Sequence, residues 1–154
     1  MSIRTTVSPE EAADRLAIRE LIDAYACCAD ACNPEGQMAL FSPGARFMAY
    51  MDPRSSEPTM DLNSRADLAP VFENLNVYEA TTHFIGQSVI SLDGDRGEGE
   101  TYCLAHHVLV DGELRSLTIA SIRYLDAFLK SEGVWLFAER RLYVDWTDTR
   151  PMRD

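Results

Sequence analysis

The chain has 154 residues, of which 46% are hydrophobic and 25% are charged, so we expect one globular domain over residues 1–154. Its formal net charge of −11 would repel nucleic-acid phosphates and anionic lipids, which excludes both as natural partners. No apolar run is long enough to cross a bilayer. Three of the four cysteines cluster within residues 27–32, at spacings that suit neither a disulfide framework nor zinc. We expect reduced thiols in a cytoplasmic protein.

The first part of the chain predicts helices. In Ser8-Pro9-Glu10-Glu11, Ser8 can cap a helix, Pro9 suits its first position and Glu11 completes a capping box. Helical periodicity then continues to about Ala31. The expected buried stripe consists of Ala17, Leu21, Ala24, Tyr25 and Cys28.

Shorter elements follow this helix. Asn33-Pro34-Glu35 repeats the cap-then-proline pattern and predicts a second helix, which Ser42-Pro43-Gly44 would end. Residues 45–51 predict a strand and residues 52–63 a loop. A third helix is expected from Ser64, with apolar side chains at helical spacing at Leu68, Val71, Phe72 and Leu75.

The second half is rich in β-branched and aromatic residues. Four such runs, residues 81–92, 98–110, 114–129 and 134–146, are separated by Asp-Gly or Glu-Gly pairs that indicate antiparallel hairpins. Helices followed by a meander predict an α+β fold with the helices on the concave face of a bent sheet. Residues 114–125 are apolar on both faces, and a partner subunit is the simplest cover for the outer one. We therefore expect a homo-oligomer.

The three histidines are candidates for acid–base chemistry. His83 lies early in one predicted strand, and His106 and His107 lie in the next, where only one of the two can share its face. A neutral imidazole held by a carboxylate is a competent base near neutral pH. Asp30 ends an apolar helix, where the helix dipole disfavours an acid, and this position points to a role other than solvation.

Each candidate catalytic residue also has a purely structural interpretation. An isolated histidine is more often a packed or surface residue. Of Arg140 and Arg141, one should point inward, either to pair with an acidic neighbour or to stabilise an anion. Tyr25 lies on the apolar helix stripe, where its hydroxyl needs a partner. The sequence has no Gly-rich phosphate loop, nucleophile elbow or metal-ligand cluster.

Four stretches resemble the SnoaL-like proteins of the nuclear transport factor 2-like superfamily, and among them the scytalone dehydratase group. They are Tyr25-x-x-x-x-Asp30 and residues 82–86, 100–107 and 133–138, and the resemblance extends over roughly residues 13–146. It implies a cystatin-like α+β barrel, in which a cone-shaped antiparallel sheet and three helices enclose a deep apolar pocket.

The resemblance also implies an activity. Asp30 and His83 correspond to a catalytic dyad that works without metal or organic cofactor, in which the histidine takes a proton from carbon as a leaving group departs. Tyr25, Arg140 and either His106 or His107 match assisting positions. We favour His107 because it shares strand parity with Cys103 and Ala105, small residues that suit a pocket wall.

Two departures leave the substrate open. Scytalone dehydratase holds a water with two tyrosines, whose positions fall at Ala29 and Ala49 here, while Tyr50 is one residue out of register. The expected function is elimination from a small cyclic or polycyclic apolar compound by a dimer or trimer. The alternatives are an isomerase of the ketosteroid type, a non-catalytic ligand-binding or interaction module, and a dioxygenase β-subunit.

Overall fold

In the computed structural model, residues 6–152 are described. Helix α1 spans Pro9–Asp30 and begins as predicted, with the backbone N–H of Glu11 donating to the Ser8 hydroxyl at 3.2 Å. Its buried face is turned from the expected stripe. Leu21 and Tyr25 are buried as expected, but Ala17 is exposed and Ala24 and Cys28 are only half-buried. The larger side chains of the helix, Ile18 and Ile22, cover the sheet instead, because they remove more apolar area from water.

The predicted second helix and first strand are both present, but the boundary between them differs from the prediction. Helix α2 spans Pro34–Ala39, and strand β1 spans Phe41–Tyr50. The strand starts at Phe41 rather than Ala45 because Phe41 already pairs with Phe137 of the last strand. Pro43 and Gly44 fall within an irregular stretch of that pairing, between Phe41 and Arg46, so they do not end the ladder.

The predicted loop and third helix are each more divided than expected. A short strand β2, Met60–Leu62, lies within the loop and pairs with β1. The third helical region consists of a 3-10 turn at Arg65–Leu68 (η1), helix α3 at Ala69–Glu73, and a second 3-10 turn at Asn74–Val77 (η2).

Four long strands complete the sheet: β3 Ala80–Asp93, β4 Arg96–Asp111, β5 Leu114–Ser131 and β6 Val134–Pro151. The predicted hairpins are confirmed, and the glycine in each turn has the positive φ that these turns require, 57°, 62° and 82° in chain order. The sheet order is β2-β1-β6-β5-β4-β3. All neighbours are antiparallel except β1 and β6, which run parallel.

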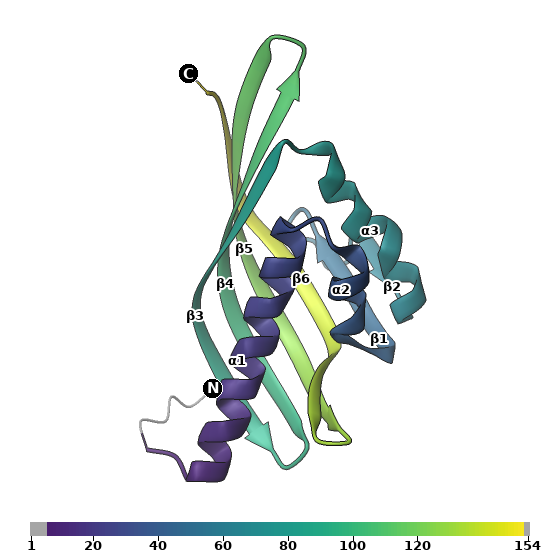
Figure 1. Cartoon of the computed structure of the whole chain (residues 1–154), viewed down its shortest axis with the longest axis vertical. Helices are drawn as coiled ribbons and strands as arrows, with labels where there is room; N and C mark the ends of the chain where they lie inside the picture. Colours follow the sequence, from purple (N-terminus) through teal and green to yellow (C-terminus); the bar gives the residue numbers. More distant parts are fainter. Residues whose placement is uncertain (1–5, 153–154) are drawn as a thin grey trace.

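The α+β fold with a curved sheet is therefore confirmed, with two differences in detail. The sheet is mixed rather than wholly antiparallel, and it stays open between β2 and β3 instead of closing as a barrel. The three helices lie on one face of the sheet, with α1 crossing the long strands (Figure 1). The core between the layers is aromatic, built around Tyr25, Phe41, Phe72 and Phe137.

Candidate active site

Asp30 and His83 meet at the end of α1. The Nδ1 atom of His83 lies 2.7 Å from Oδ1 of Asp30, and the backbone N–H of His83 donates to Oδ2 at 2.9 Å. The Thr81 hydroxyl donates to Oδ1 at 2.9 Å. Thr81 and His83 are two residues apart in β3, so their side chains share the face toward the helix.

These contacts explain how a carboxylate is held at a helix C-terminus. The dipole of α1 disfavours negative charge there, and three donors to the Asp30 carboxylate offset that effect. An ionised carboxylate can only accept hydrogen bonds, so the His83 nitrogen that faces it, Nδ1, must carry the proton. In the neutral ring, Nε2 then keeps its lone pair. Within residues 6–152, no group hydrogen-bonds to that Nε2 atom.

The His83 side chain faces a cavity of about 360 Å³ that lies between the helices and the concave face of the sheet. Its side chain is 7% exposed and lines the cavity, whereas that of Asp30 is 29% exposed and lies behind it. No aspartate, glutamate, lysine or arginine lines the cavity among the described residues. The apolar wall includes Phe47, Val71, Phe72, Leu75, Ile122, Leu142 and Val144. Such a cavity suits an uncharged, largely apolar molecule.

His107 is the second histidine in the wall. Its ring stacks on Tyr78 at a centroid distance of 4.7 Å and meets the His83 ring edge-on at 5.6 Å. Its Nε2 atom is buried and has no hydrogen-bond partner within residues 6–152. The neighbouring His106 is absent from the cavity wall, in keeping with strand alternation. Burial, and then the charge of nearby His83, lower the pKa of His107 to about 4, so its ring is neutral at pH 7.

This pKa shift predicts an acid-sensitive stability. The unfolded chain takes up the His107 proton near pH 6.5 and the folded chain only near pH 4, so stability should fall as the pH drops through that window. The loss should be at most about 3 kcal/mol, reduced by partial solvent screening. Urea unfolding of the parent and of His107→Phe at pH 7 and pH 5 measures it. A variant with the same pH dependence as the parent would contradict the assignment.

Tyr25 lies in the cavity wall, where its ring makes edge contacts with Phe41, Phe72, Tyr124 and Phe137. Burial raises the pKa of its hydroxyl, so Tyr25 is a neutral phenol. A neutral phenol can donate a hydrogen bond to a ligand oxygen.

Arg140 lies behind this wall and does not line the cavity. Its side chain is 0% exposed, and two of its nitrogens pair with the Asp126 carboxylate at 2.8 Å each. The guanidinium carbon lies 4.1 Å from the Tyr25 ring centroid and 4.0 Å from that of Tyr124. The sequence placed Arg140 at an assisting position toward substrate. In the structure, Asp126 on β5 holds the guanidinium beneath the Tyr25 ring, and the third nitrogen, Nη1, is buried without a hydrogen-bond partner among the described residues.

Thr81 and Gln37 are among the polar residues near the cavity that the sequence pattern does not indicate. Thr81 completes the support of Asp30, and its position two residues before His83 in a strand could have indicated this. Gln37 of α2 is 1% exposed and lines the cavity. Its burial depends on how α2 packs against α1 and α3, which residue spacing alone does not reveal.

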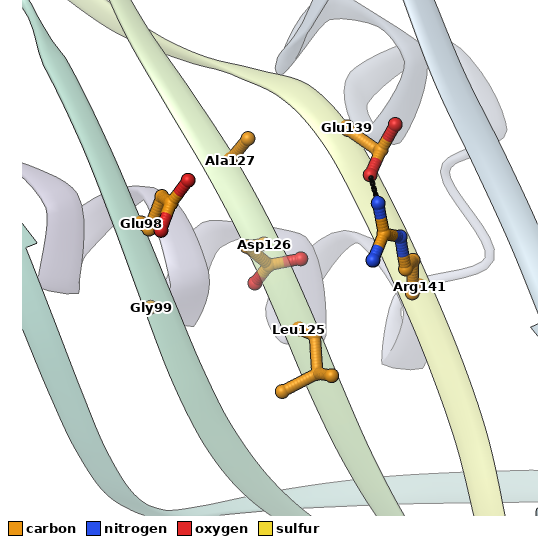
Figure 2. A pocket seen from close by; sticks show the side chains of 7 residues that line it. All are labelled: Glu98, Gly99, Leu125, Asp126, Ala127, Glu139 and Arg141. Carbon is orange, nitrogen blue, oxygen red and sulfur yellow. Dashed lines mark ion pairs between the residues drawn. The ribbon is translucent and has the colours of Figure 1, made fainter. Parts of the chain in front are cut away.

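Other features of the described residues lie apart from this cavity. No group of three or more metal-ligating side chains occurs within residues 6–152. A hollow of about 230 Å³ lies on the opposite, convex face, across β4, β5 and β6, where Figure 2 shows the ion pair of Glu139 and Arg141. Those two side chains approach to 2.7 Å. The hollow contains none of the histidines.

The sequence matches the SnoaL-like domain over residues 10–141. The chain belongs to the SnoaL-like family. A comparison with curated proteins found no match. No helix within residues 6–152 has the length and apolar character needed to span a membrane.

Solved structures of this SnoaL-like protein's neighbours share its fold. A candidate scytalone dehydratase from Novosphingobium aromaticivorans is 20% identical with a TM-score of 0.77, covering 93% of this chain and 91% of its own. A hexachlorocyclohexane dehydrochlorinase, LinA type 2, is 18% identical with a TM-score of 0.73 and the same coverage, 93% and 91%. The β-subunit of a candidate aromatic-ring-hydroxylating dioxygenase from N. aromaticivorans is 24% identical with a TM-score of 0.74, covering 88% and 92%. Similarity at this level establishes the fold alone, because one fold can carry unrelated functions.

Proposed function

We propose that this protein is a cofactor-independent lyase that abstracts a proton from carbon. The observation that carries the proposal is the His83 imidazole, hydrogen-bonded to Asp30 through Nδ1 at 2.7 Å and facing an apolar cavity with Nε2 unpaired. A base oriented in this way matches the geometry that general base catalysis requires. The known eliminases among its structural neighbours are consistent with the proposal.

The reaction assigns a role to each polar group. His83 Nε2 takes a proton from the carbon next to a carbonyl, and Asp30 stabilises the imidazolium that forms. The C–H electron pair becomes the new carbon–carbon double bond while the C–O bond breaks, and the departing hydroxyl takes the proton from the His83 imidazolium, so that water leaves and the neutral base is restored. His107 and Tyr25 lie in the wall as neutral hydrogen-bonding groups for the carbonyl or the leaving oxygen. Asp30 acts through His83 and is therefore a positioning residue.

The experiment is a screen of cyclic β-hydroxyketones in D₂O, followed by proton NMR. Water loss produces new vinyl signals, and reversible proton abstraction alone appears as deuterium exchange at the α-carbon. Turnover by elimination supports the lyase, and double-bond migration without water loss would instead support an isomerase. Binding with neither exchange nor turnover would indicate the non-catalytic ligand-binding alternative and overturn the proposal.

We also infer that the convex face of the sheet joins identical subunits in a dimer or trimer. Phe84 is 67% exposed on this face, and Tyr102 and Leu104 of the adjacent strand are also exposed. These three side chains surround part of a further apolar depression. An exposed apolar cluster on a sheet face is a typical subunit interface, and a second copy of the chain is the occupant we assign to it.

Phe84→Glu and Leu104→Glu should each shift the protein toward monomer, because each would bury a charge in the interface. Light scattering after size-exclusion chromatography measures the change. Leu16→Glu is the matched control, since Leu16 is exposed on α1, away from this face. A parent protein that is already monomeric at micromolar concentration would contradict the inference.

We further propose a reducing, cytoplasmic location. All four cysteines are free thiols, and Cys27 and Cys32 are exposed. Exposed thiols persist in a reducing compartment and oxidise elsewhere. Thiol titration of the protein recovered from a cytoplasmic fraction tests the proposal.

A further inference from the structure

Tyr78 is anchored at the edge of the cavity through its backbone. It follows the 3-10 turn η2, and its N–H donates to the Leu75 carbonyl at 3.2 Å. The next residue, Glu79, donates its N–H to the Val108 carbonyl at 2.8 Å and forms an ion pair with Arg115 on β5. These contacts hold the backbone between η2 and the sheet, and the Tyr78 side chain lines the cavity.

The His107 ring packs between two aromatic rings. Tyr78 stacks on it at a centroid distance of 4.7 Å, with 24° between the two planes. The His83 ring meets it edge-on at 5.6 Å and 72°. His83 itself is oriented by a hydrogen bond to a carboxylate. No carboxylate lines the cavity among the described residues, so the flat face of Tyr78 is the surface that orients His107.

The His107 ring has a nitrogen available for a ligand. Its Nε2 atom is buried and has no hydrogen-bond partner in the described part of the chain, which is unfavourable in a folded protein. A neutral imidazole has one N–H and one lone pair, so this nitrogen can donate or accept, according to the tautomer. An oxygen of a molecule in the cavity is the partner that its position favours.

Water exclusion keeps this ring neutral. Burial is the largest cause of the lowered pKa of His107. Among the charged groups, His83 on β3 lowers that pKa further, Asp30 of α1 raises it and His106 on β4 lowers it. The facing residue in β5 is the uncharged Thr118. Removing the ring that covers His107 should therefore raise its pKa.

We propose that Tyr78 is a positioning residue, which orients the His107 ring in the cavity wall and shields it from water so that His107 can hydrogen-bond to a substrate oxygen as an uncharged group. The inference rests on the proposed function, because it gives His107 a part in the reaction at His83. It assigns to the turn before β3 a control over a side chain on β4.

An NMR titration of the free protein tests the positioning without any substrate. The imidazole C–H signals are followed between about pH 5 and about pH 8, and they are assigned by replacing each histidine in turn. His107 of the parent should stay neutral across this range. In Tyr78→Ala its pKa should rise into the range, because water then reaches the ring. Tyr78→Phe keeps the stacked ring and should behave like the parent.

Two further variants complete the series. Tyr78→Leu keeps an apolar side chain without a ring, and it replaces Tyr78→Ala if that variant does not fold, with a shift expected in the same direction. Tyr50→Ala is the matched control, because Tyr50 stacks on Tyr143 at 4.4 Å and 9° but does not line the cavity. It should lower the Tm and leave the His107 titration unchanged.

Kinetics on a substrate from the β-hydroxyketone screen measure the consequence for the reaction. Tyr78→Ala should lower kcat by about 10–100-fold and change KM less, because a misplaced hydrogen-bonding group costs most in the transition state. Tyr78→Phe should keep kcat within about twofold of the parent value. In a His107→Phe background, Tyr78→Ala should lower kcat by less than about twofold more, because a positioning residue acts through the residue that it holds.

The opposite results overturn the inference. A His107 titration in Tyr78→Ala and Tyr78→Leu that matches the parent would show that Tyr78 does not shield the ring. Equal losses of kcat from Tyr78→Ala with and without His107 would show that Tyr78 acts independently of it. Failure of the proposed function is a separate result, in which His83→Ala retains full turnover of an identified substrate, and it would leave the NMR titration unaffected.

Discussion

His83→Ala should lower kcat/KM for the elimination by about 10²–10⁴-fold, the range expected when a general base is removed. Among residues 6–152, the His83 imidazole is the only base that hydrogen-bonds to a carboxylate through one ring nitrogen and lines the cavity with the other nitrogen free. The measurement is steady-state kinetics on the best substrate from the β-hydroxyketone screen, with circular dichroism to confirm folding. His106→Ala is the matched control, because His106 lies in the neighbouring strand β4 but does not line the cavity.

Asp30→Asn provides an intermediate case. An amide can accept the His83 proton at Nδ1 or donate to it, so the tautomer with a lone pair at Nε2 is no longer enforced. kcat should fall while KM changes little, because Asp30 is absent from the cavity wall. Full activity of His83→Ala would show that another group is the base, and the assignment of the dyad would then be wrong.

Arg140→Met should destabilise the fold by about 3–5 kcal/mol, the largest stability effect that we expect for a single substitution in this chain. It leaves the Asp126 carboxylate buried with no partner, at 0% side-chain exposure. The guanidinium also contacts the faces of Tyr25, Tyr124 and Phe137 at 4.0–4.1 Å, and those contacts would be lost. Urea or thermal unfolding measures the change.

The double variant Asp126→Leu/Arg140→Met separates a structural from a catalytic role. Replacing both partners removes the unpaired charge, so much of the lost stability should return. If Arg140 only supports the wall, the double variant should keep most of the parent kcat. A stable double variant with kcat reduced by about 10²-fold or more would show instead that the arginine stabilises the transition state directly.

Local sequence signals were sufficient for most of the architecture. The cap at Ser8, the Asp-Gly and Glu-Gly turns and the β-branched runs all act over a few residues, and each formed as predicted. The strand start at Phe41 and the buried face of α1 differ, because both are set by contacts with distant strands. Tertiary packing can override local pattern at such positions.

The site was only partly accessible from sequence. Asp30 and His83 were paired through resemblance to a family, since 53 residues separate them and no spacing rule connects a helix end with a later strand. Gln37 gave no signal, because a glutamine in a short helix is usually exposed. Strand alternation predicts that one of Arg140 and Arg141 points inward, but it does not identify the partner Asp126, which decides where the Arg140 guanidinium lies.

The parallel pairing of β1 with β6 has a consequence for how the protein folds. Phe47 in β1 pairs with Arg140 in β6, which lies near the end of the chain. The strands β3, β4, β5 and β6, by contrast, pair with their neighbours in sequence through tight hairpins. The hairpin strands can therefore associate early, while β1 must wait until the last strand has formed. During synthesis, the helices and β1 emerge from the ribosome well before the strand that secures them. Until β6 is added, their aromatic side chains remain available to chaperones.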